Sequence, residues 1–599
     1  EGKTHVNQEA TNALKSKVKE IRDYLKDYLA EDLDAMNQVE KVYNEKFNNT
    51  VPRDYEKIAE VFEFPNMNPE IELRPHQKTA IVRALLGGNS LLAHGVGAGK
   101  TYEQIAIAME AKRLGLANKP LLVVPNTKLT DFENDAKALY PGAKVLALSQ
   151  DDFDGNSIKR TLALAALNDW DMVIVRHSSF SKIPVSPATQ IPALQAEIQE
   201  LEAGLADKAG KRGFTIKKME KRLEQLRVKL DQYQENRVQY EGLMYFEDMG
   251  FDMLIVDEAH EYKNYPLTGR ATAIKGLASG DADKARDMMI KSGYIRKLNG
   301  GNRGVVFGTG TPISNSMAEV FVMFKYLRPD LLQEAGISNF DAWTDAFADI
   351  REVAEISARG EFRNKFQFKS FVNLPELITL FREFTDIKMQ DDLDLPLPKH
   401  EVIKVECDPH PLLAEVMKRV DDAWDAAIKD RTLFRLINIV LNAPQDMRLV
   451  MAGAQNHKGS KVNKVTENAY KIYKETAREK GTQLIFATTG ESSLTGFSLW
   501  DEIKAQLVKK GIPANEIAFI KTGIKEDQLE EIYRKINAGK IRVAIGSFSK
   551  MGVGINVQER LFAIHELNAP YRPADIEQAE GRMIRQGNSY YGTDKTVQV

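Results

Sequence analysis

Short apolar runs alternate with segments of helical spacing along much of this chain. Six such runs lie between residues 71 and 330. Runs of about four apolar residues bounded by turn signals are typical of strands that are buried on both faces. Strands that alternate with helices predict a parallel sheet covered by helices. The expected strands are 90–92, 121–124, 145–147, 172–175, 254–256 and 305–307.

The same alternation returns near the C-terminus. Four further apolar runs predict a second α/β unit over residues 476–599. The last residues, 595–599, have the composition of the middle of a strand, and the chain begins at Glu1 without an initiator methionine. Both ends therefore lead us to expect a piece of a longer polypeptide. The four runs are 482–486, 517–520, 541–545 and 561–565.

Segments outside the two units have helical patterns. Residues 1–70 are expected to form an N-terminal helical segment and a linker. Residues 1–50 are polar, with apolar residues such as Ile21 and Leu25 at helical spacing, and Pro65 and Pro69 mark the linker at 65–69. Residues 331–475 are expected to form a mostly helical bridge between the first sheet domain, 71–330, and the second.

Residues 181–240 interrupt the first alternation with two runs of coiled-coil spacing. Gly210 and Gly213 separate the runs, which predicts an antiparallel helical hairpin inserted into the first sheet domain. The second arm is basic, which fits an ordinary solvated helix face or an arm that touches DNA or a protein partner. The apolar positions are Leu194, Ile198, Leu201, Leu205, Ile216, Met219, Leu223, Leu226, Leu230 and Tyr233. The basic positions are Lys217, Lys218, Lys221, Arg222, Arg227 and Lys229.

Composition limits the classes of function. At 599 residues the chain has room for about two to four domains. Its net charge of −3 requires any nucleic-acid surface to be local. Cys407 is the only cysteine, which excludes an internal disulfide and a cysteine-rich zinc site and fits a reducing cytosol. No apolar run reaches about 18 residues, so no membrane-spanning helix is expected.

The residues after the first expected strand have a phosphate-binding pattern. Ala93-His-Gly-Val-Gly-Ala-Gly-Lys-Thr101 connects that strand to a helix. Glycines let backbone N–H groups turn towards phosphate oxygens, and the helix N-terminus adds partial positive charge. We expect Lys100 to reach the β- and γ-phosphates of ATP and Thr101 to hold Mg²⁺. One position departs from the strict pattern, because His94 stands where a glycine is usual, five residues before Gly99.

A second motif ends a strand with two carboxylates. In Phe251-Asp-Met-Leu-Ile-Val-Asp-Glu-Ala-His260, Asp257 suits the second Mg²⁺ position and Glu258 can polarise water. Thr309 and Thr311 follow the last strand of the same unit, and their hydroxyls are expected to link the carboxylates to the nucleic-acid side. A plain glycine and proline turn is the alternative. The phosphate loop and the carboxylate pair together predict a nucleotide hydrolase.

Two other polar side chains in the first unit are candidates for ligand contact. Gln77 follows Leu73-Arg-Pro-His, and its amide can pair with adenine; helix capping at a polar turn is the alternative. Lys128 lies after a strand, at the carboxyl edge where ligands bind in such sheets, and phosphate contact is possible there.

The second unit contributes arginines. Ser547-Phe-Ser-Lys-Met-Gly-Val-Gly-Ile-Asn556 is a glycine-containing turn, and a helix with Arg582 and Arg585 three residues apart on one face is expected after it. Arginines offered across a cleft stabilise charge on a transferring phosphoryl group, and a surface arginine pair is the alternative. The nucleotide-binding candidates are Gln77, Gly97, Gly99, Lys100, Thr101, Gly554 and Gln578.

In this order the motifs resemble those of superfamily 2 helicases. The variants Gly310-Thr-Pro-Ile-Ser-Asn315 and Lys263-Asn264 are most similar to Swi/Snf-type double-stranded DNA translocases. A closer resemblance is to the helicase half of the large methylase–helicase proteins of phages and other mobile elements. That resemblance covers about residues 1–599 and is seen at the phosphate loop, Phe340-Asp-Ala-Trp343, Asn373-Leu-Pro-Glu-Leu377 and Arg572-Pro-Ala-Asp-Ile-Glu-Gln578.

The resemblance implies an α/β fold with two RecA-like parallel-sheet lobes, a helical insertion and a helical bridge. It also implies ATP and Mg²⁺ in the cleft between the lobes and ATP-driven movement along double-stranded DNA. An N-terminal methyltransferase domain in the full-length protein, a role in defence or counter-defence, a phage origin and the cytoplasm of a bacterial host are further expectations. Candidate nucleic-acid contacts are Lys128, Lys263 and Lys550.

Two other functions remain open. A helicase that separates the strands of DNA or RNA would use the same motifs. A non-hydrolysing DNA-binding or structural assembly module would not need Lys100, Glu258 and Arg585, so their presence argues against it. The departure of the phosphate loop at His94 nevertheless leaves room for weak turnover, which keeps such a module open.

Overall fold

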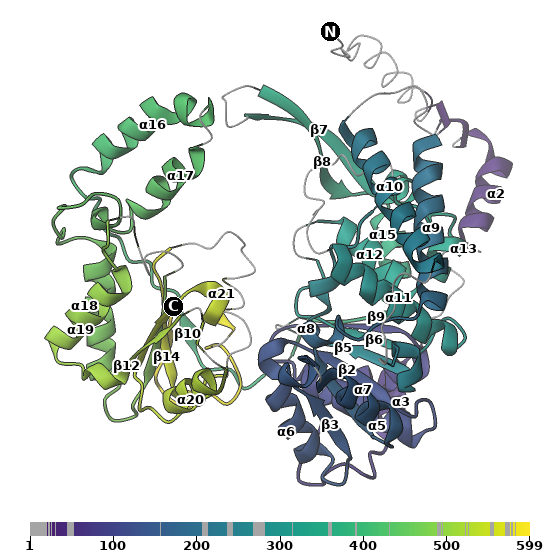
Figure 1. Ribbon diagram of the computed structural model, residues 1–599, viewed down its shortest axis with the longest axis horizontal. Helices are drawn as coiled ribbons and strands as arrows, with labels where there is room; N and C mark the ends of the chain where they lie inside the picture. Colours follow the sequence, from purple (N-terminus) through teal and green to yellow (C-terminus); the bar gives the residue numbers. More distant parts are fainter. Residues whose placement is uncertain are drawn as a thin grey trace. The chain divides into compact units, whose positions relative to one another are not determined.

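The computed structural model of the chain (Figure 1) describes residues 21, 24–25, 27–29, 31–44, 53–155, 157–206, 214–235, 244–267, 282–313, 316–356, 362–389, 392–393, 395–429, 432–487, 493, 495–521, 523–524, 526–551, 556–568, 576, 579–581 and 583–599. Among these residues, no helix combines the length and the apolar character needed to cross a membrane.

The chain folds as two compact units. The smaller comprises residues 1–54 and 373–383, and the larger comprises residues 55–372 and 384–599. In the smaller unit, α2 (Leu33–Tyr43) is capped by Asp32, whose side chain accepts hydrogen bonds from the backbone N–H groups of Asp34 and Ala35. The same unit contains α15 (Leu374–Arg382), which has a proline in its first turn.

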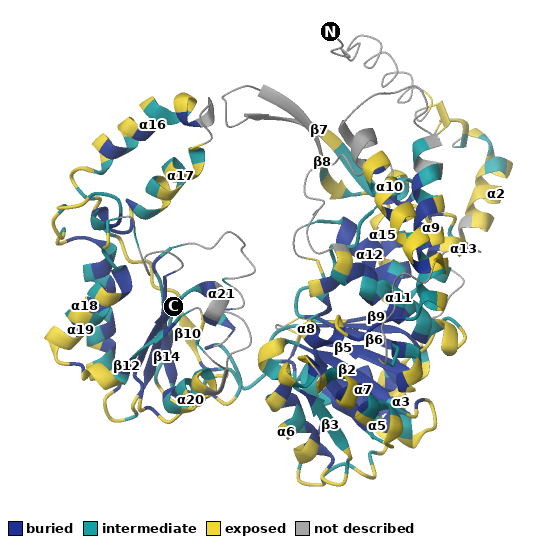
Figure 2. Ribbon diagram, in the orientation of Figure 1, coloured by how far each residue is buried: buried dark blue, intermediate teal, exposed yellow. Residues whose placement is uncertain are grey.

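Among the described residues, the first sheet domain of the larger unit has seven parallel strands in the order β3-β4-β2-β5-β6-β1-β9. Apart from β3 and β9, these strands are buried along their whole length, which explains their continuous apolar sequences. Figure 2 shows the burial of these strands. The strands are β1 (Ser90–His94), β2 (Pro120–Val124), β3 (Val145–Leu148), β4 (Met172–Arg176), β5 (Met253–Val256), β6 (Val305–Gly308) and β9 (Thr385–Lys388).

Helices cover both faces of this sheet. One continuous apolar core joins three helices to alternate residues of the strands, among them Leu92, Leu122 and Ile255. These helices are α4 (Pro75–Gly87), α5 (Lys100–Arg113) and α6 (Leu129–Leu139). Further helices of the domain are α7 (Ser157–Leu167), α8 (His177–Phe180), α11 (Ala282–Leu298) and α12 (Ala318–Leu327). Because side chains alternate along a strand, α11, which contacts β5 and β6, completes the burial of the sheet.

The expected linker at 65–69 is part of the first sheet domain. Helix α3 (Tyr55–Val61) packs against α4, and Phe62, Phe64 and Met67 pack against the core of the domain. Asn68 also donates from its backbone to the Leu139 carbonyl. The prolines stop a helix here, but Phe62, Phe64 and Met67 attach the segment to the sheet domain.

The inserted hairpin consists of α9 (Pro187–Ala206) and α10 (Phe214–Gln234), which pack against each other. The leucines of the two heptad patterns form its apolar seam. Glu197 of α9 accepts from Arg286 of α11 at 3.1 Å, and Arg222 of the basic arm lies 3.3 Å from the same carboxylate. Arg227 pairs with Glu202, so part of the basic arm's charge is neutralised within the hairpin.

In the part of the second sheet domain that the structure describes, six parallel strands lie in the order β10-β15-β14-β11-β13-β12. Helices lie on both sides of this sheet, and two separate apolar cores occupy its two faces. The strands are β10 (His400–Glu401), β11 (Thr482–Phe486), β12 (Ile517–Ile520), β13 (Val543–Gly546), β14 (Leu561–Glu566) and β15 (Val597–Gln598). The helices are α18 (Lys461–Glu475), α19 (Leu499–Lys510), α20 (Glu526–Asn537) and α21 (Phe548–Met551). The α/β class with two parallel sheets is thus confirmed.

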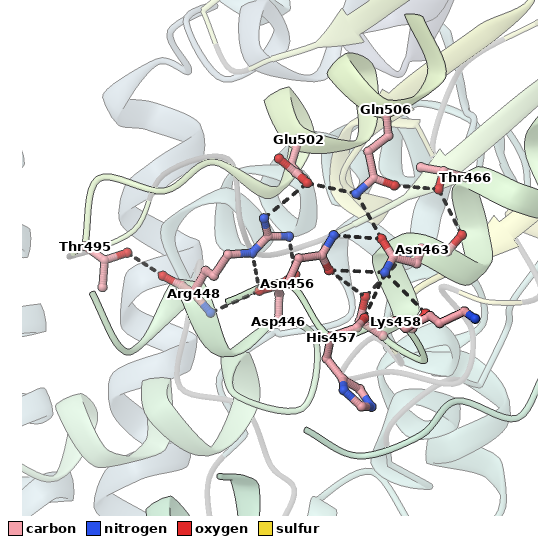
Figure 3. A network of polar contacts seen from close by, with 11 residues as sticks. Asp446, Arg448, Asn456, His457, Lys458, Asn463, Thr466, Thr495, Glu502 and Gln506 are labelled. Atoms are coloured by element: carbon pink, nitrogen blue, oxygen red, sulfur yellow. Dashed lines mark hydrogen bonds and ion pairs between the residues drawn. The ribbon is translucent and has the colours of Figure 1, made fainter. Parts of the chain in front are cut away.

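A polar network joins the segment before α18 to α19 (Figure 3). The Arg448 guanidinium lies 2.8 Å from an oxygen of Asp446 and 3.1 Å from one of Glu502, which is in the first turn of α19. Asn463 of α18 accepts from Gln506 of α19 at 2.9 Å. These bonds satisfy polar groups that lose their contact with water when the two helices pack together.

The interval 331–475 contains more than helices. Its helices are α13 (Pro329–Glu334, which starts just before it), α14 (Phe340–Phe347), α15, α16 (Leu413–Lys429), α17 (Leu433–Asn442) and α18. Between α14 and α15, β7 (Ala348–Ile356) and β8 (Phe362–Phe371) form an antiparallel ribbon. The alternation Phe362, Phe366, Phe368 is a strand signal that the helical expectation overlooked. The same interval also supplies β9 and β10, one to each sheet.

Strand β9 lies at the edge of the first sheet, beside His94, the residue that departs from the phosphate-loop pattern. Its residues pair with β1 from Leu91 to His94. The fully buried His94 imidazole lies between two carboxylates, with Nε2 2.9 Å from Asp386 of β9 and Nδ1 3.0 Å from Glu103 of α5. Burial alone lowers the pKa of His94, but the Glu103 charge and the hydrogen bonds to both carboxylates outweigh it and raise the pKa to about 9.

This buried imidazolium makes stability depend on pH. Because the folded-state pKa of His94 lies above its unfolded value of 6.5, its contribution is complete below that pH and is lost as the pH rises through about 9. The shift corresponds to roughly 3 kcal/mol in the free energy of unfolding. In the Asp386→Asn variant, this stability should be lost at a lower pH, because only the Glu103 carboxylate would then favour the charged form of His94. Denaturant unfolding of both proteins across this pH range is the measurement, and superimposable profiles would contradict the assignment.

Candidate functional site

The phosphate loop has the backbone that its glycines predict. It lies between the end of β1 and the start of α5, with positive φ angles of 86° at Gly97 and 90° at Gly99. L-residues rarely adopt these angles, and a Cβ at Gly99 would also collide with the Gln77 amide. The Lys100 ammonium turns back over the loop and donates to the carbonyls of His94 at 2.7 Å and Gly95 at 3.2 Å. The N-terminus of α5 therefore presents N–H groups and an ammonium to the same space.

Gln77 caps the start of α4, which is the alternative role that the sequence allowed for it. Its Oε1 accepts from the Arg74 backbone N–H at 2.9 Å, which satisfies the start of α4. Its Nε2 donates to the Gly99 carbonyl at 3.1 Å. The amide thus ties α4 to the phosphate loop and keeps one hydrogen and one lone pair for other partners.

The two expected acidic residues lie at the end of β5. Asp257 is buried and accepts from the Gln104 amide of α5 at 3.0 Å. Burial and, after it, the neighbouring Glu258 charge raise the pKa of Asp257 to about 6. Glu258 itself has a φ of 48°, an uncommon conformation for a residue with a Cβ. Two carboxylates held together in a partly buried site favour a bound cation.

Thr309 connects this pair to the segment after β6. His260 Nδ1 lies 3.2 Å from a Glu258 oxygen and 3.1 Å from the Thr309 hydroxyl. The buried Thr309 Oγ1 also accepts from the Thr311 backbone at 3.1 Å. The hydroxyl therefore fixes the turn and contacts the acidic motif through His260.

His177 is a site residue that the sequence interpretation missed. It begins α8 directly after β4, and its Nε2 lies 3.0 Å from the Asp257 carbonyl. Its Nδ1 lies 2.8 Å from the Tyr262 hydroxyl, and the two rings stack. Burial, and then the Lys284 charge, lower the pKa of His177 to about 4, so the ring is neutral near pH 7. A polar residue at the carboxyl end of a buried strand was the available signal.

Residues of the second sheet domain reach the phosphate loop. The Gln586 amide donates to the Gly97 carbonyl at 2.6 Å, and Arg74 donates to the Gln586 Oε1. The preceding Arg585 is also close, since a Cβ added at Gly97 would lie 4.0 Å from its Cγ. Burial lowers the pKa of Arg585, although nearby Asp131 partly opposes this. Two parts of the chain almost five hundred residues apart therefore meet at one loop.

The expected arginine helix is shorter than the spacing predicts. The last backbone bond of helical type described there runs from Ile584 to Glu580, and residues 583–586 form turns. Gly587, with a φ of 80°, lies just beyond. The prediction that Arg585 lies on a helix face is therefore wrong, because Arg585 lies in the bend that follows the helix. Arg582, Gln578, Gly554 and the Lys550 side chain lie outside the described residues.

A cleft of about 1090 Å³ contains most of the predicted site. Lys100, Thr101, Asp257 and Glu258 line it from the first sheet domain, and Arg585 lines it from the second. Five other predicted residues also line this cleft, namely Gln77, Gly97, Gly99, Lys128 and Thr311. Its cationic and acidic groups together fit a nucleotide and a divalent cation.

The cleft can hold Mg²⁺ without a dedicated protein cage. Within the part of the chain that the structure describes, no three His, Cys, Asp or Glu side chains gather into a metal-binding cluster. Mg²⁺ is usually bound by one or two carboxylates or hydroxyls together with substrate phosphates and water. The buried Asp257 and the Thr101 hydroxyl, both in the cleft wall, suit that pattern.

The lysines expected to contact nucleic acid differ in position. Lys128 lies in the wall of the cleft, where its ammonium is 2.7 Å from Asp131. Lys263 is almost buried and lies 3.3 Å from Glu319. This environment favours a structural role for Lys263, because a buried ion pair does not present its charge to a phosphate backbone.

Residues 84–389 match the family described as "Probable helicase domain", and residues 1–49 match a domain of unknown function, DUF8437. The chain is 25% identical over 403 residues to "Defense against restriction protein B" of Escherichia phage P1. That match spans 60% of this chain but only 18% of the phage protein.

Among solved structures, the "Sulfolobus solfataricus SWI2/SNF2 ATPase core in complex with dsDNA" aligns over 90% of this chain and 89% of its own. The TM-score is 0.33 and the sequence identity 16%. The family match, by contrast, extends from within α4 to the end of β9 and includes the whole of the first sheet. Because it covers half of the chain, this protein belongs to the family described as a probable helicase domain.

Proposed function

We propose that this chain is an ATP-dependent translocase on double-stranded DNA. The observation that carries the proposal is the meeting of two sheet domains at one phosphate loop, where Gln586 bonds to Gly97 and Arg585 lines the same cleft. A nucleotide bound there would touch both domains. Its binding and hydrolysis would then change the relation between them, which is the requirement for a motor of this class.

In this proposal the triphosphate lies on the loop at the start of α5. Backbone N–H groups between Gly97 and Lys100 and the Lys100 ammonium bind its phosphates. The adenine pairs with the free hydrogen and lone pair of the Gln77 amide. Gly554 and Gln578 are assigned to the same nucleotide from the opposite domain.

Hydrolysis is assigned to the acidic motif. Glu258 polarises the attacking water, and His260 holds its carboxylate. Mg²⁺, when bound at Thr101 and Asp257, would neutralise charge on the phosphates. His177 and Gln104 fix the backbone and the carboxylate of Asp257, respectively.

The second domain supplies positive charge to the reaction. Arg585, with Arg582 as its partner in the proposal, stabilises the charge that develops on the transferred phosphoryl group. Because these arginines interact with the triphosphate only when the cleft is closed, ATP favours the closed state and its products release it. Repeated closure would move the DNA-binding surfaces of the two domains past each other.

Duplex DNA is the proposed track because of the resemblance of residues 310–315 and 263–264 to double-stranded DNA translocases. Contacts to phosphates should dominate, so affinity should fall steeply with salt and depend little on sequence. Lys128 and Lys550 are the lysines we assign to this surface. A counter-defence role in a phage-infected bacterial cytoplasm, in a longer protein with a methyltransferase domain, is proposed from the phage relative and the resemblance.

The first prediction concerns Glu258. Replacement by glutamine keeps the shape but removes the base, so DNA-stimulated ATP turnover should fall about 10²–10⁴-fold. Glu261→Gln is the matched control, because this carboxylate lines the same cleft but pairs with Lys284 at 3.1 Å. Steady-state phosphate release with saturating duplex is the measurement. Equal rates in wild type and Glu258→Gln would favour the non-hydrolysing scaffold.

The second prediction concerns Arg585. Lysine keeps the charge but loses the planar fork, and kcat should fall by about 10³-fold if the arginine acts on the transition state. The KM for ATP should change much less. Arg534→Lys, an exposed arginine on α20 of the same domain, should leave both constants unchanged. A rise in KM alone would assign Arg585 to ground-state binding instead.

The third prediction separates translocation from strand separation. The chain should displace a third strand from a triplex in the presence of ATP but should not unwind a forked duplex, because movement along intact duplex needs no base pair to open. The Glu258→Gln variant serves as the control in both assays. Unwinding of the fork without displacement of the triplex strand would replace the proposal with a strand-separating helicase.

A further inference from the structure

His94 has a use that the phosphate-binding motif does not explain. Its side chain is fully buried, although the residue lies at the mouth of a ligand-binding loop where a glycine is usual. His94 is not among the residues that line the cleft. Instead it bridges Glu103 on α5 and Asp386 on β9, at 3.0 and 2.9 Å. Further positive charge lies beyond, where Arg83 is 4.0 Å from the Asp386 carboxylate.

Strand β9 leads directly to the second sheet domain. It ends at Lys388, and the chain enters the second sheet at β10, which begins at His400 and pairs with β15. The backbone of the phosphate loop is attached to the start of this connection, because Gly95 donates to the Lys388 carbonyl at 2.9 Å. Leu395 lies close as well, since a Cβ added at Gly97 would be 3.9 Å from its Cδ1.

The main chain of His94 is bound by the phosphate-binding lysine. Lys100 donates to the His94 carbonyl at 2.7 Å and to the Gly95 carbonyl at 3.2 Å. A triphosphate on the loop competes with these two carbonyls for the same ammonium. One residue is therefore linked to the nucleotide site through its backbone and to the interdomain connection through its side chain.

We propose that His94 is a positioning residue that couples the state of the phosphate loop to residues 389–399, the connection between the two sheets. A glycine could hold the loop but could not bridge α5 and β9. A hydrogen-bonded ring between two buried carboxylates has little freedom, so a shift of the loop backbone moves Asp386 and the start of the connection with it. This inference rests on the proposed function, because it takes the loop to be the nucleotide site.

The test measures how readily a protease cleaves the connection. Lys399 is exposed, so trypsin cleavage after it reports on this segment. In the wild-type chain, a saturating non-hydrolysable ATP analogue should slow this cleavage about threefold or more, and in Asp386→Asn the effect should disappear. His94→Gln breaks the same link from the other side, so the test does not depend on one variant folding. Peptides are quantified by mass spectrometry, and an unfolding curve checks each variant.

A buried hydrogen bond elsewhere on α5 provides the control. Tyr140→Phe removes the bond from this hydroxyl to Glu110, on the same helix but away from the loop and β9. Its analogue-dependent change in cleavage should equal that of the wild type. A merely structural role of His94 would lower the unfolding midpoint of His94→Gln and Asp386→Asn and leave the analogue effect in both.

The double variant His94→Gln with Asp386→Asn tests whether the two residues act as one link. Its cleavage response should equal that of either single variant, because each substitution alone already removes the interaction between the His94 imidazole and the Asp386 carboxylate. Absence of analogue binding to the wild type would overturn the proposed function. Binding with an unchanged cleavage rate, or with the same change in wild type and Asp386→Asn, would overturn the coupling and leave the function standing.

Discussion

The phosphate loop keeps its shape because separate parts of the chain bond to its backbone. Gln77 donates to the Gly99 carbonyl from α4, Lys100 donates to the His94 carbonyl from α5, and Gln586 donates to the Gly97 carbonyl from the second sheet domain. Backbone polar groups in such a tight turn cannot all bond to each other, so side chains must satisfy them. Every other feature of the site depends on this one arrangement, because it fixes where α5 begins and where the cleft is.

The acidic side of the cleft is held by a different set of contacts. Asp257 is fixed through its carboxylate by Gln104 and through its carbonyl by His177, while Glu258 has a left-handed backbone conformation. Uncommon backbone angles persist only where neighbours determine them, and such residues cluster at active sites. The neutral His177 and the raised pKa of Asp257 are consequences of the same burial. Asp257 is therefore placed by α5 and α8 as much as by the strand that precedes it.

The departure at His94 is explained by the edge of the sheet. A strand that joins a sheet at its edge has only one neighbour, and β9 is short, with two of its four residues buried. The buried ion pair between His94 and Asp386 adds an attachment that glycine cannot make. Such a pair is weak evidence for stability but can specify one arrangement among several. Here it specifies which segment of the chain lies beside the phosphate loop.

Sequence alone determined the elements whose signals are local. The strands from β1 to β6 and from β11 to β14 appear as apolar runs, and the glycines of the loop and the pair at Asp257 follow strands directly. Tertiary structure alone decided the partners, since His94 and Asp386 are separated by 292 positions and Gln586 and Gly97 by 489. The strand β9 was missed for the same reason. A polar side chain in a short segment carries no local sign of the group that will bury it, because only the folded chain brings that group near.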